Sequence, residues 1–378
     1  MLSNVKSMTR TFYPVGQGAF YREKFTFDNN EDVFNIVYDC GTKTHQGSAN
    51  IDNILNNWNI NEPVDILFIS HFHKDHISKV KDLVSKTRTK MVVMPYLSDE
   101  DKKYYKMGIV YSSITSNSFD AKEIIEDINF INNPGKALKR NKIENICYVA
   151  KNYEIDRIND NVIKVTEGNL FDKTDKIKIL QNFKATWVLD VFVSSEFDRK
   201  QIIEDFEKNV CRVSELNNEE KIKEIFTTKI DEIKEIYKEN LNEKSLVLYS
   251  GPPSTITNDA CKHAIFPPLY ISRRVGCLYT GDYNASSDRF YNEMMEHFID
   301  YEKDIGLLQL PHHGSSKSFN DNFFKMKCAY IVCAGEKNQH KHPSYSVVNK
   351  IIGRRKRLFI VTENSKELSF RIKKSNNY

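Results

Sequence analysis

Short apolar runs separated by polar stretches occupy the first hundred residues of the chain. The runs at Phe34–Asp39, Pro63–Ile69 and Lys90–Leu97 are bounded by polar or turn-forming residues, which predicts buried strands. Thr11–Phe27 is expected to form a hairpin that turns at its two glycines, and Ala49–Asn59 is expected to form a helix. This order of strands and helices is typical of an α/β protein.

The middle of the chain has a different pattern. Ser98–Gln181 is polar, and two helices are predicted in it, near Glu100–Tyr111 and Asp120–Asn132. Arg199–Glu243 is predicted to be helical, because apolar residues between Ile222 and Tyr237 recur at three- and four-residue steps. We expect this apolar stripe to pack on the rest of the protein, with docking to a protein partner as the alternative.

Four further strands are predicted in the C-terminal part of the chain. They are Leu246–Tyr249, Gly276–Tyr279, Gly306–Leu310 and Ala329–Val332. The loops that follow the last three carry polar residues with metal-binding or catalytic side chains, namely Asp282, His312, His313 and His342.

The strand at Pro63–Ile69 leads into a stretch rich in metal-binding side chains, HFHKDH at His71–His76. Imidazoles at i and i+2 of an extended loop can face one cation, and the carboxylate of Asp75 with the imidazole of His76 can reach a second position. Nitrogen and oxygen ligands at this density suit zinc, manganese or iron. Ile77–Val84 is expected to continue as a helix. The sequence therefore predicts a metal site at the carboxyl end of a parallel strand, where open α/β sheets place their sites.

Composition narrows the class of protein. A formal net charge of +4 over 378 residues permits an anionic substrate without requiring one. The seven cysteines form no C-x-x-C pair, as expected of buried free thiols in a reducing compartment. No apolar run approaches the ~18 residues of a membrane-spanning helix, and the N-terminus lacks the pattern of a signal peptide. We therefore expect a soluble, cytoplasmic protein without a membrane partner.

Several motifs carry a resemblance to a known family. HFHKDH fits the H-x-H-x-D-H signature of the metallo-β-lactamase superfamily, and TGD at Thr280–Asp282 and LPHHGS at Leu310–Ser315 fit its later ligand motifs. The chain more specifically resembles the hydrolase domain of the DNA-uptake protein ComEC and its relatives, and that resemblance covers residues 12 to 363. It rests on VGQG at Val15–Gly18, VYDCG at Val37–Gly41, NEKSLVL at Asn242–Leu248 and HPS at His342–Ser344.

The resemblance implies a four-layer αββα metallo-β-lactamase fold. Residues 1–378 would form a single domain of this fold, with a polar insertion at 98–181 and a helical insertion at 199–243 that together form a lid region. Ala19 and Ile77–Lys79 depart from the residues that relatives tend to have at these places, which affects the expected fine geometry rather than the fold.

The same resemblance, together with the residue types, implies one or two divalent cations, zinc or manganese. His71 and His73 would hold the first, Asp75 and His76 the second, Asp282 would bridge them, and His312 would complete the second site, with His313 as the less favoured alternative. Asp39 would anchor the metal loop without binding a cation. No histidine occurs between His76 and His263, so the third histidine that many superfamily members give to the first metal is missing or replaced.

The candidate catalytic residues are Asp75 and His342. His342 would touch the scissile group or protonate a leaving oxygen, because the pKa of imidazole suits a general acid. The alternative for His342 is a loop histidine beside a helix that begins near Ser344. Substrate-binding candidates are His313, Ser315 and Ser316, the two serines through hydroxyl and backbone N–H groups.

The expected function is the hydrolysis of phosphodiester bonds, most specifically those of DNA, by a metal-activated hydroxide. Basic residues near the motifs favour an anionic substrate; they are Lys74, Lys317, Lys341 and the cluster Arg354–Arg357. The alternatives are a small-molecule phosphodiesterase acting on a cyclic nucleotide or phosphocholine ester, and a metal-bound interaction subunit of a larger assembly. β-Lactam hydrolysis is not expected, because the third histidine is missing.

Overall fold

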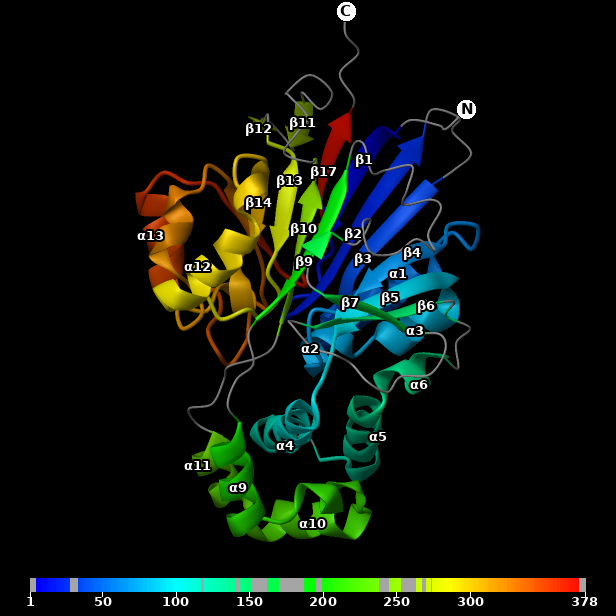
Figure 1. The fold of residues 1–378 in the computed structure, drawn as a ribbon, viewed down its shortest axis with the longest axis vertical. Helices are drawn as coiled ribbons and strands as arrows, with labels where there is room; N and C mark the ends of the chain where they lie inside the picture. The colour runs from blue at the N-terminus through cyan, green and yellow to red at the C-terminus, as the bar shows by residue number, and fades with distance from the viewer. Residues whose placement is uncertain are drawn as a thin grey trace, which may run out of the picture. The chain divides into compact units, whose positions relative to one another are not determined.

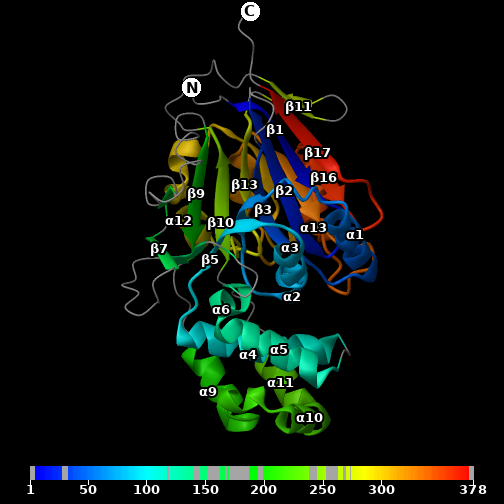
Figure 2. The same ribbon diagram turned by 90° about the vertical axis from the view of Figure 1, so that its right-hand side faces the viewer.

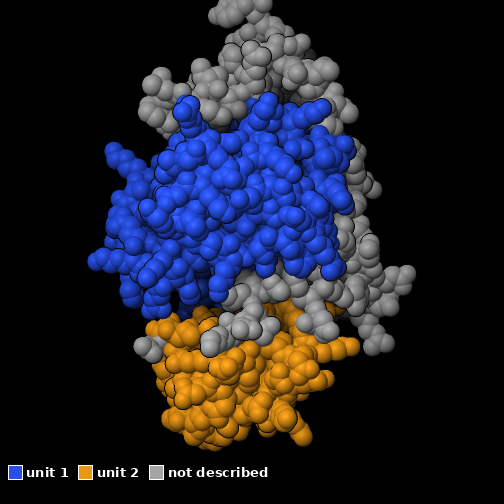
Figure 3. All heavy atoms as spheres, turned by 90° about the vertical axis from the view of Figure 1, so that its left-hand side faces the viewer, with its two compact units in different colours: residues 1–95, 142–195, 244–378 blue, residues 96–141, 196–243 orange. Residues whose placement is uncertain are grey.

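The structure is a computed structural model of the 378-residue chain. It describes residues 5–27, 33–116, 119–139, 143, 145–150, 162–166, 168–169, 187–194, 199–237, 245–252, 263–266, 270–272 and 274–373. The chain divides into two compact units (Figure 3). Unit 1 comprises Met1–Pro95, Lys142–Ser195 and Lys244–Tyr378, and unit 2 comprises Tyr96–Asn141 and Glu196–Glu243.

Unit 1 contains two sheets (Figure 1). The first has the order β12 (Tyr270–Ser272), β11 (His263–Phe266), β17 (Leu368–Lys373), β1 (Val5–Phe12), β2 (Gly18–Phe27), β3 (Val33–Thr42), β4 (Val64–Phe68), β5 (Thr89–Pro95), β6 (Asn145–Ala150), β7 (Val162–Thr166). The second has the order β16 (Leu358–Val361), β15 (Ala329–Cys333), β14 (Ile305–Gln309), β13 (Gly276–Tyr279), β10 (Leu246–Gly251), β9 (Val188–Val193), β8 (Gly168–Asn169).

Each sheet combines an antiparallel and a parallel part. β1, β2 and β3 pair antiparallel, whereas β3 to β7 run parallel. In the second sheet β9, β10 and β13 pair antiparallel, and β13 to β16 run parallel. The strand predicted before the histidine-rich loop is therefore confirmed as β4, a fully buried strand with parallel neighbours on both sides.

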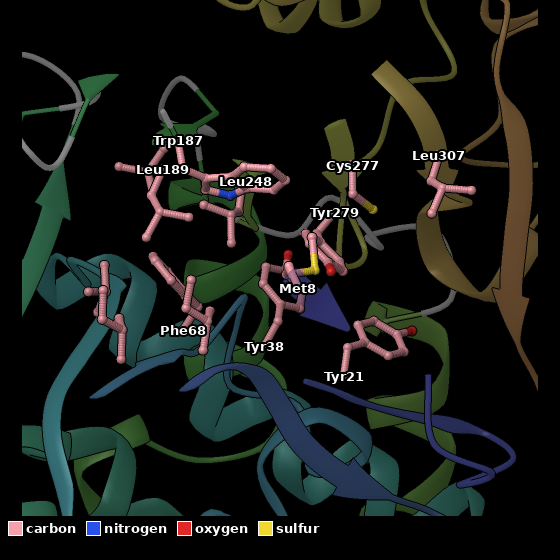
Figure 4. Close-up of a cluster of buried hydrophobic side chains, with 14 of the residues drawn as sticks. Met8, Tyr21, Tyr38, Phe68, Trp187, Leu189, Leu248, Cys277, Tyr279 and Leu307 are labelled. Atoms are coloured by element: carbon pink, nitrogen blue, oxygen red, sulfur yellow. The ribbon is translucent and has the colours of Figure 1, made fainter. Parts of the chain in front are cut away.

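The main hydrophobic core lies between the two sheets. Side chains such as Tyr38 and Phe68 from the first sheet meet Leu189, Leu248 and Tyr279 from the second (Figure 4). Alternate residues of each strand point into this layer, as the two-residue period of a strand requires. Burial of these apolar side chains holds the sheets face to face.

Helices cover the outer faces of both sheets (Figure 2). On the first sheet α1 (His45–Asn56) and α3 (Val80–Lys86) contact β3, and the short helix α2 (Lys74–Ile77) contacts β2 and β3. On the second sheet, α12 (Asp288–His297) and α13 (Tyr345–Gly353) share an apolar cluster with β10, β14 and β15. The predicted four-layer αββα class is confirmed by this order of helices, sheet, sheet and helices.

A buried ionic network also links the two sheets. Nε of Arg10 lies 2.6 Å from Oε1 of Glu23, and both side chains are fully buried. The guanidinium donates to the carbonyl oxygens of Ser250 and Val275, while the hydroxyls of Ser250 and Tyr279 donate to the Glu23 carboxylate. Burial of this charge pair is tolerated because its polar atoms are satisfied by hydrogen bonds from the facing sheet.

Unit 2 is helical. Its elements are α4 (Asp99–Thr115), α5 (Ala121–Asn132), α6 (Pro134–Lys139), α9 (Lys200–Asn209), the 3-10 helix η1 (Val213–Asn217), α10 (Glu219–Thr228) and α11 (Ile230–Tyr237). The predicted apolar stripe is buried, and its residues Ile222, Ile225, Ile233 and Tyr237 pack against residues of α4, α5 and α9. The stripe thus forms the core of unit 2, and the condition for a docking face, exposure in the isolated chain, is not met.

Some element boundaries differ from those predicted. The helix predicted at Ala49–Asn59 begins at His45, because the hydroxyl of Thr44 accepts a hydrogen bond from the N–H of Gly47 and caps it. The helix predicted at Ile77–Val84 corresponds mainly to α3 (Val80–Lys86), and the additional short helix α2 (Lys74–Ile77) places Asp75 and His76 on a helical turn. The polar segment predicted at 98–181 lies in part outside the described residues, chiefly between 151 and 181. None of the described helices has the length and apolar composition needed to span a bilayer.

Candidate metal centre

The histidine-rich loop begins where β4 ends. His71 and His73 lie on the extended segment after the strand, and His73 is the N-cap residue of α2. Asp75 and His76 follow within the first turn of that helix, and both are buried. Consecutive residues of an α-helix point about 100° apart, since a turn has 3.6 residues. The change from loop to helix therefore lets one hexapeptide present ligands to two different positions.

Two glycines allow α2 to lie directly on the first sheet. A Cβ atom on Gly41 would lie 2.5 Å from the carbonyl carbon of His76, and one on Gly18 would lie 2.9 Å from the carbonyl oxygen of Asp75. Any larger residue would push the helix and its ligands outward. This contact gives a physical reason for the glycines in the VGQG and VYDCG motifs.

The remaining ligand candidates come from the second sheet. Asp282 follows β13, and its backbone N–H is held by the hydroxyl of Ser245. His312 and His313 follow β14 within the short 3-10 segment η3 (Pro311–Gly314), and both have left-handed backbone torsions, with φ of 47° and 51°. Such torsions are costly for residues other than glycine and occur most often at functional sites.

The structure brings these residues together in two groups. In the first cluster, ligand atoms of His71, His73 and Asp282 lie within 4.8 Å of one another, and in the second cluster those of Asp75, His76 and His313 do. The Asp282 carboxylate lies between them, with Oδ2 3.6 Å from Nε2 of His71 and Oδ1 3.1 Å from Nε2 of His76. Asp282 therefore lies where a bridging ligand would have to lie, and its predicted bridging role stays a prediction.

The structure distinguishes His313 from His312, which the sequence could not. Nε2 of His313 lies 3.3 Å from Oδ2 of Asp75, and its ring is buried. His312 is partly exposed, and its Nε2 lies 3.7 Å from Oδ2 of Asp282. The sequence interpretation gave His312 to the second cluster, whereas the structure places His313 there.

Hydrogen bonds at Nδ1 orient the buried imidazoles. Nδ1 of His76 lies 2.8 Å from Oδ2 of Asp39, and Nδ1 of His313 lies 2.9 Å from the carbonyl oxygen of Cys333. Nδ1 of His71 lies 2.9 Å from the hydroxyl of Ser70, which itself donates to Asp39. In metal sites, histidine ligands commonly donate the second ring N–H to such outer partners, which fixes the tautomer and aims Nε2 at the cation.

Electrostatics favour ionised carboxylates in both clusters. Burial alone would raise the pKa of Asp282, but the neighbouring His312, His76 and His313 outweigh it and hold the pKa well below its usual range. Burial would likewise raise the pKa of Asp75, and Lys43, whose Nζ lies 3.1 Å from Oδ1, lowers it well below that range. Both side chains can therefore act as anionic ligands.

The histidines differ in protonation. Burial, followed by repulsion from His76, lowers the pKa of His71 well below its ordinary value, so its imidazole is neutral. Burial would also lower the pKa of His76, but the carboxylates of Asp282 and Asp39 outweigh it and raise the pKa well above that value. A cation in the second cluster would therefore compete with the proton of His76.

The buried donor atoms of the two clusters are suitable ligands for a cation. Among the described residues, Oδ1 of Asp282, Nε2 of His76 and Nε2 of His313 are buried and make no well-aligned hydrogen bond. Imidazole nitrogens and carboxylate oxygens are the donor set of zinc, manganese and iron sites, so the donor chemistry matches as well.

The predicted catalytic histidine lies beside the clusters. The ring centroid of His342 is 5.4 Å from that of His312 and 6.4 Å from that of His313. Burial and the neighbouring histidines lower the pKa of His342 to about 3, so its imidazole is neutral at pH 7. The predicted contact with the substrate, the predicted role as a general acid and the alternative of a loop histidine beside α13 therefore all stay predictions.

The predicted phosphate-binding serines lie in the loop after η3. The backbone N–H of Ser315 donates to the carbonyl oxygen of His312, and that of Ser316 donates to the hydroxyl of Ser344. Because both N–H groups are used within the protein, any contact of these residues with a phosphate falls to their hydroxyls. Lys43, which the sequence interpretation did not include, is a further cation at the site through its contact with Asp75.

No protein-family model matches the chain, and no curated protein matches its sequence. Solved structures similar to it include the metallo-β-lactamase fold protein YhfI from Bacillus subtilis, with 8% identity over 96% of this chain and 99% of that chain and a TM-score of 0.36. Human tRNase Z, short form, has 10% identity over 94% and 92% and a TM-score of 0.38, and unliganded yeast PDE1 has 8% identity over 98% and 100% and a TM-score of 0.44. Likenesses this low support no statement about function, and the finer resemblance to ComEC stays a prediction.

Proposed function

We propose that unit 1 is a metal-dependent hydrolase of phosphodiester bonds, and specifically a nuclease acting on DNA. The observation that carries the proposal is the pair of ligand clusters on either side of the Asp282 carboxylate. Two cations held a few ångströms apart would lower the pKa of a bound water and offset the charge that develops on a phosphoryl group.

Three residues of the site would have separate roles in this reaction. Asp282 would fix the spacing of the cations, with one carboxylate oxygen toward each cluster. Lys43 would donate a hydrogen bond to a phosphoryl oxygen, because its amine lies at the second cluster and is partly exposed. His342 would orient the substrate as a neutral hydrogen-bonding group beside His312 and His313.

The distribution of charge supports an anionic substrate. Lys and Arg outnumber Asp and Glu in unit 1, whereas Asp and Glu outnumber Lys and Arg in unit 2. The net charge of the whole chain is therefore small, although unit 1, which contains the candidate metal centre, is basic. A basic surface attracts a polyanion such as DNA, with an affinity that falls as the salt concentration rises.

The test is cleavage of single- and double-stranded DNA and of a small chromogenic phosphodiester by the full chain with Mn²⁺ or Zn²⁺. Wild type should cleave DNA, and Asp282→Asn should lower the rate at least 100-fold. Asp65→Asn is the matched control, because Asp65 is a buried carboxylate that contacts Asn35 and Lys90, away from the clusters.

Other results of this cleavage assay would lead to different conclusions. Cleavage of the small diester alone would replace the nuclease with a small-molecule phosphodiesterase. Bound metal without cleavage of any phosphodiester would overturn the proposal and leave the interaction subunit as the remaining hypothesis. Equal loss of activity in Asp282→Asn and Asp65→Asn would show that the effect comes from folding rather than from the site.

A further inference from the structure

We propose that His312 is a ligand of the cation in the first cluster, a role that rests on the metal centre of the proposed function. Taken with His71, His73 and Asp282, it would give the first cluster three imidazoles and one carboxylate oxygen. The second cluster would then keep Asp75, His76, His313 and the other oxygen of Asp282. Both cations would have four protein ligands, and Asp282 would be shared.

The Asp282 carboxylate provides the first argument, because its two oxygens face different histidines. Oδ2 lies 3.6 Å from Nε2 of His71 and 3.7 Å from Nε2 of His312. Oδ1 lies 3.1 Å from Nε2 of His76 and 3.8 Å from Nε2 of His313. Each oxygen thus has two imidazole nitrogens within 4 Å, and His312 lies on the same side as His71.

The orientation of the His312 ring provides the second argument. Its Nδ1 lies 3.4 Å from the hydroxyl of the buried residue Ser318, so Nε2 is the nitrogen directed at Asp282. The buried histidines His71, His76 and His313 show the same division, with Nδ1 on an outer partner and Nε2 toward the carboxylates. His312 therefore has the arrangement of a ligand rather than that of a surface histidine.

The backbone explains how two adjacent histidines can serve different cations. His312 and His313 both have left-handed torsions, and the N–H of His312 donates to the carbonyl oxygen of Gly281, next to Asp282. This bond ties the turn after β14 to the turn after β13. The rings of His312 and His313 then lie 6.2 Å apart with planes at 77°, one toward each carboxylate oxygen.

His312 needs a small movement to reach a shared ligand position. It is not among the residues whose ligand atoms all lie within 4.8 Å of one another in the first cluster. Its side chain is 20% exposed, whereas that of His313 is 3% exposed, so rotation of the ring meets less resistance. A cation bound by His71, His73 and Asp282 would draw this nitrogen inward.

The test is metal binding, measured by calorimetry and by metal analysis of the dialysed protein, with the absorption of bound Co²⁺ as a second readout. Wild type should bind two cations, and His312→Ala should weaken one of them at least 10-fold while the other is unchanged. Double variants show which of the two cations His312 binds. His312→Ala added to His73→Ala should weaken only one cation and leave the other as in wild type, whereas His312→Ala added to His76→Ala should weaken both.

Two results would overturn the assignment. Unchanged affinities in His312→Ala would make His312 a substrate contact only, and a loss shared with His76→Ala instead of His73→Ala would place it in the second cluster. If His312→Ala fails to fold, as judged by circular dichroism, His312→Asp keeps a ligand oxygen and should retain both cations, which His312→Asn should not. A wild type that binds two cations but cleaves no phosphodiester would refute the proposed function and leave this assignment standing.

Discussion

Asp39 and His76 form a buried contact beside the second cluster. Oδ2 of Asp39 lies 2.8 Å from Nδ1 of His76, and the same carboxylate accepts hydrogen bonds from the backbone and hydroxyl of Ser70. Asp39 itself lies within β3, which continues to Thr42; it has a left-handed φ of 57°, and its side chain reaches the loop after β4. These contacts agree with the predicted role of Asp39 as an anchor of the metal loop, and that role stays a prediction.

Asp39→Asn should lower the affinity for one cation by about 10–100-fold, the range found when outer partners of histidine ligands are replaced. The amide offers one acceptor oxygen in place of the two that now serve Ser70 and His76. Calorimetric titration with Zn²⁺ or Mn²⁺ measures the effect. Asp65→Asn should leave both affinities unchanged, and equal affinities for wild type and Asp39→Asn would contradict the anchoring role.

Gly41→Ala should weaken metal binding although Gly41 offers no ligand. Its new methyl group would lie 2.5 Å from the backbone of His76 and displace α2 from the first sheet. Gly353→Ala is the control, since a Cβ atom there meets nothing within 4 Å. Comparison of the two variants by metal titration and thermal unfolding should show a loss for Gly41→Ala alone. Similar behaviour of both would mean that α2 tolerates the shift.

The ion pair between Arg10 and Glu23 should matter for folding rather than for metal binding. Glu23→Leu should lower the free energy of unfolding by about 3–5 kcal/mol, because it leaves the buried Arg10 without its charge partner. Adding Arg10→Met should recover part of that loss. Denaturant titration measures both, and Glu219→Ala, which removes an exposed ion pair with Lys223, should leave the midpoint unchanged. A double variant less stable than Glu23→Leu would contradict this account.

The buried thiols should resist alkylation in the folded protein. Burial raises the pKa of Cys147, Cys277, Cys328 and Cys333 to about 12, so almost none is thiolate, the reactive form, at pH 8. A Cys261→Ser variant, which leaves the six buried free cysteines that the structure describes, should react with iodoacetamide only after unfolding. Rapid labelling of Cys147, Cys277 or Cys333, which lie in the core between the two sheets, would show that the sheets separate readily in native buffer.

The sequence predicted the parts of the site that depend on short local patterns. The apolar run before His71 predicted β4, and the spacing of the potential ligands in HFHKDH predicted that they would face two positions, which correspond to the two clusters. Which of His312 and His313 lies in the second cluster could not be predicted, because the directions of the two rings depend on the left-handed torsions of the turn that carries both residues. The contact of Lys43 with Asp75 could not be predicted from the sequence either, because it depends on how α2 packs against β3.

The most direct test of the central claim is a crystal structure of the wild-type protein soaked in Mn²⁺, with anomalous difference maps. The account predicts two peaks, one on each side of the Asp282 carboxylate. The first should be coordinated by His71 and His73, and the second by Asp75, His76 and His313. A single peak away from Asp282, or no peak at a saturating Mn²⁺ concentration, would contradict it.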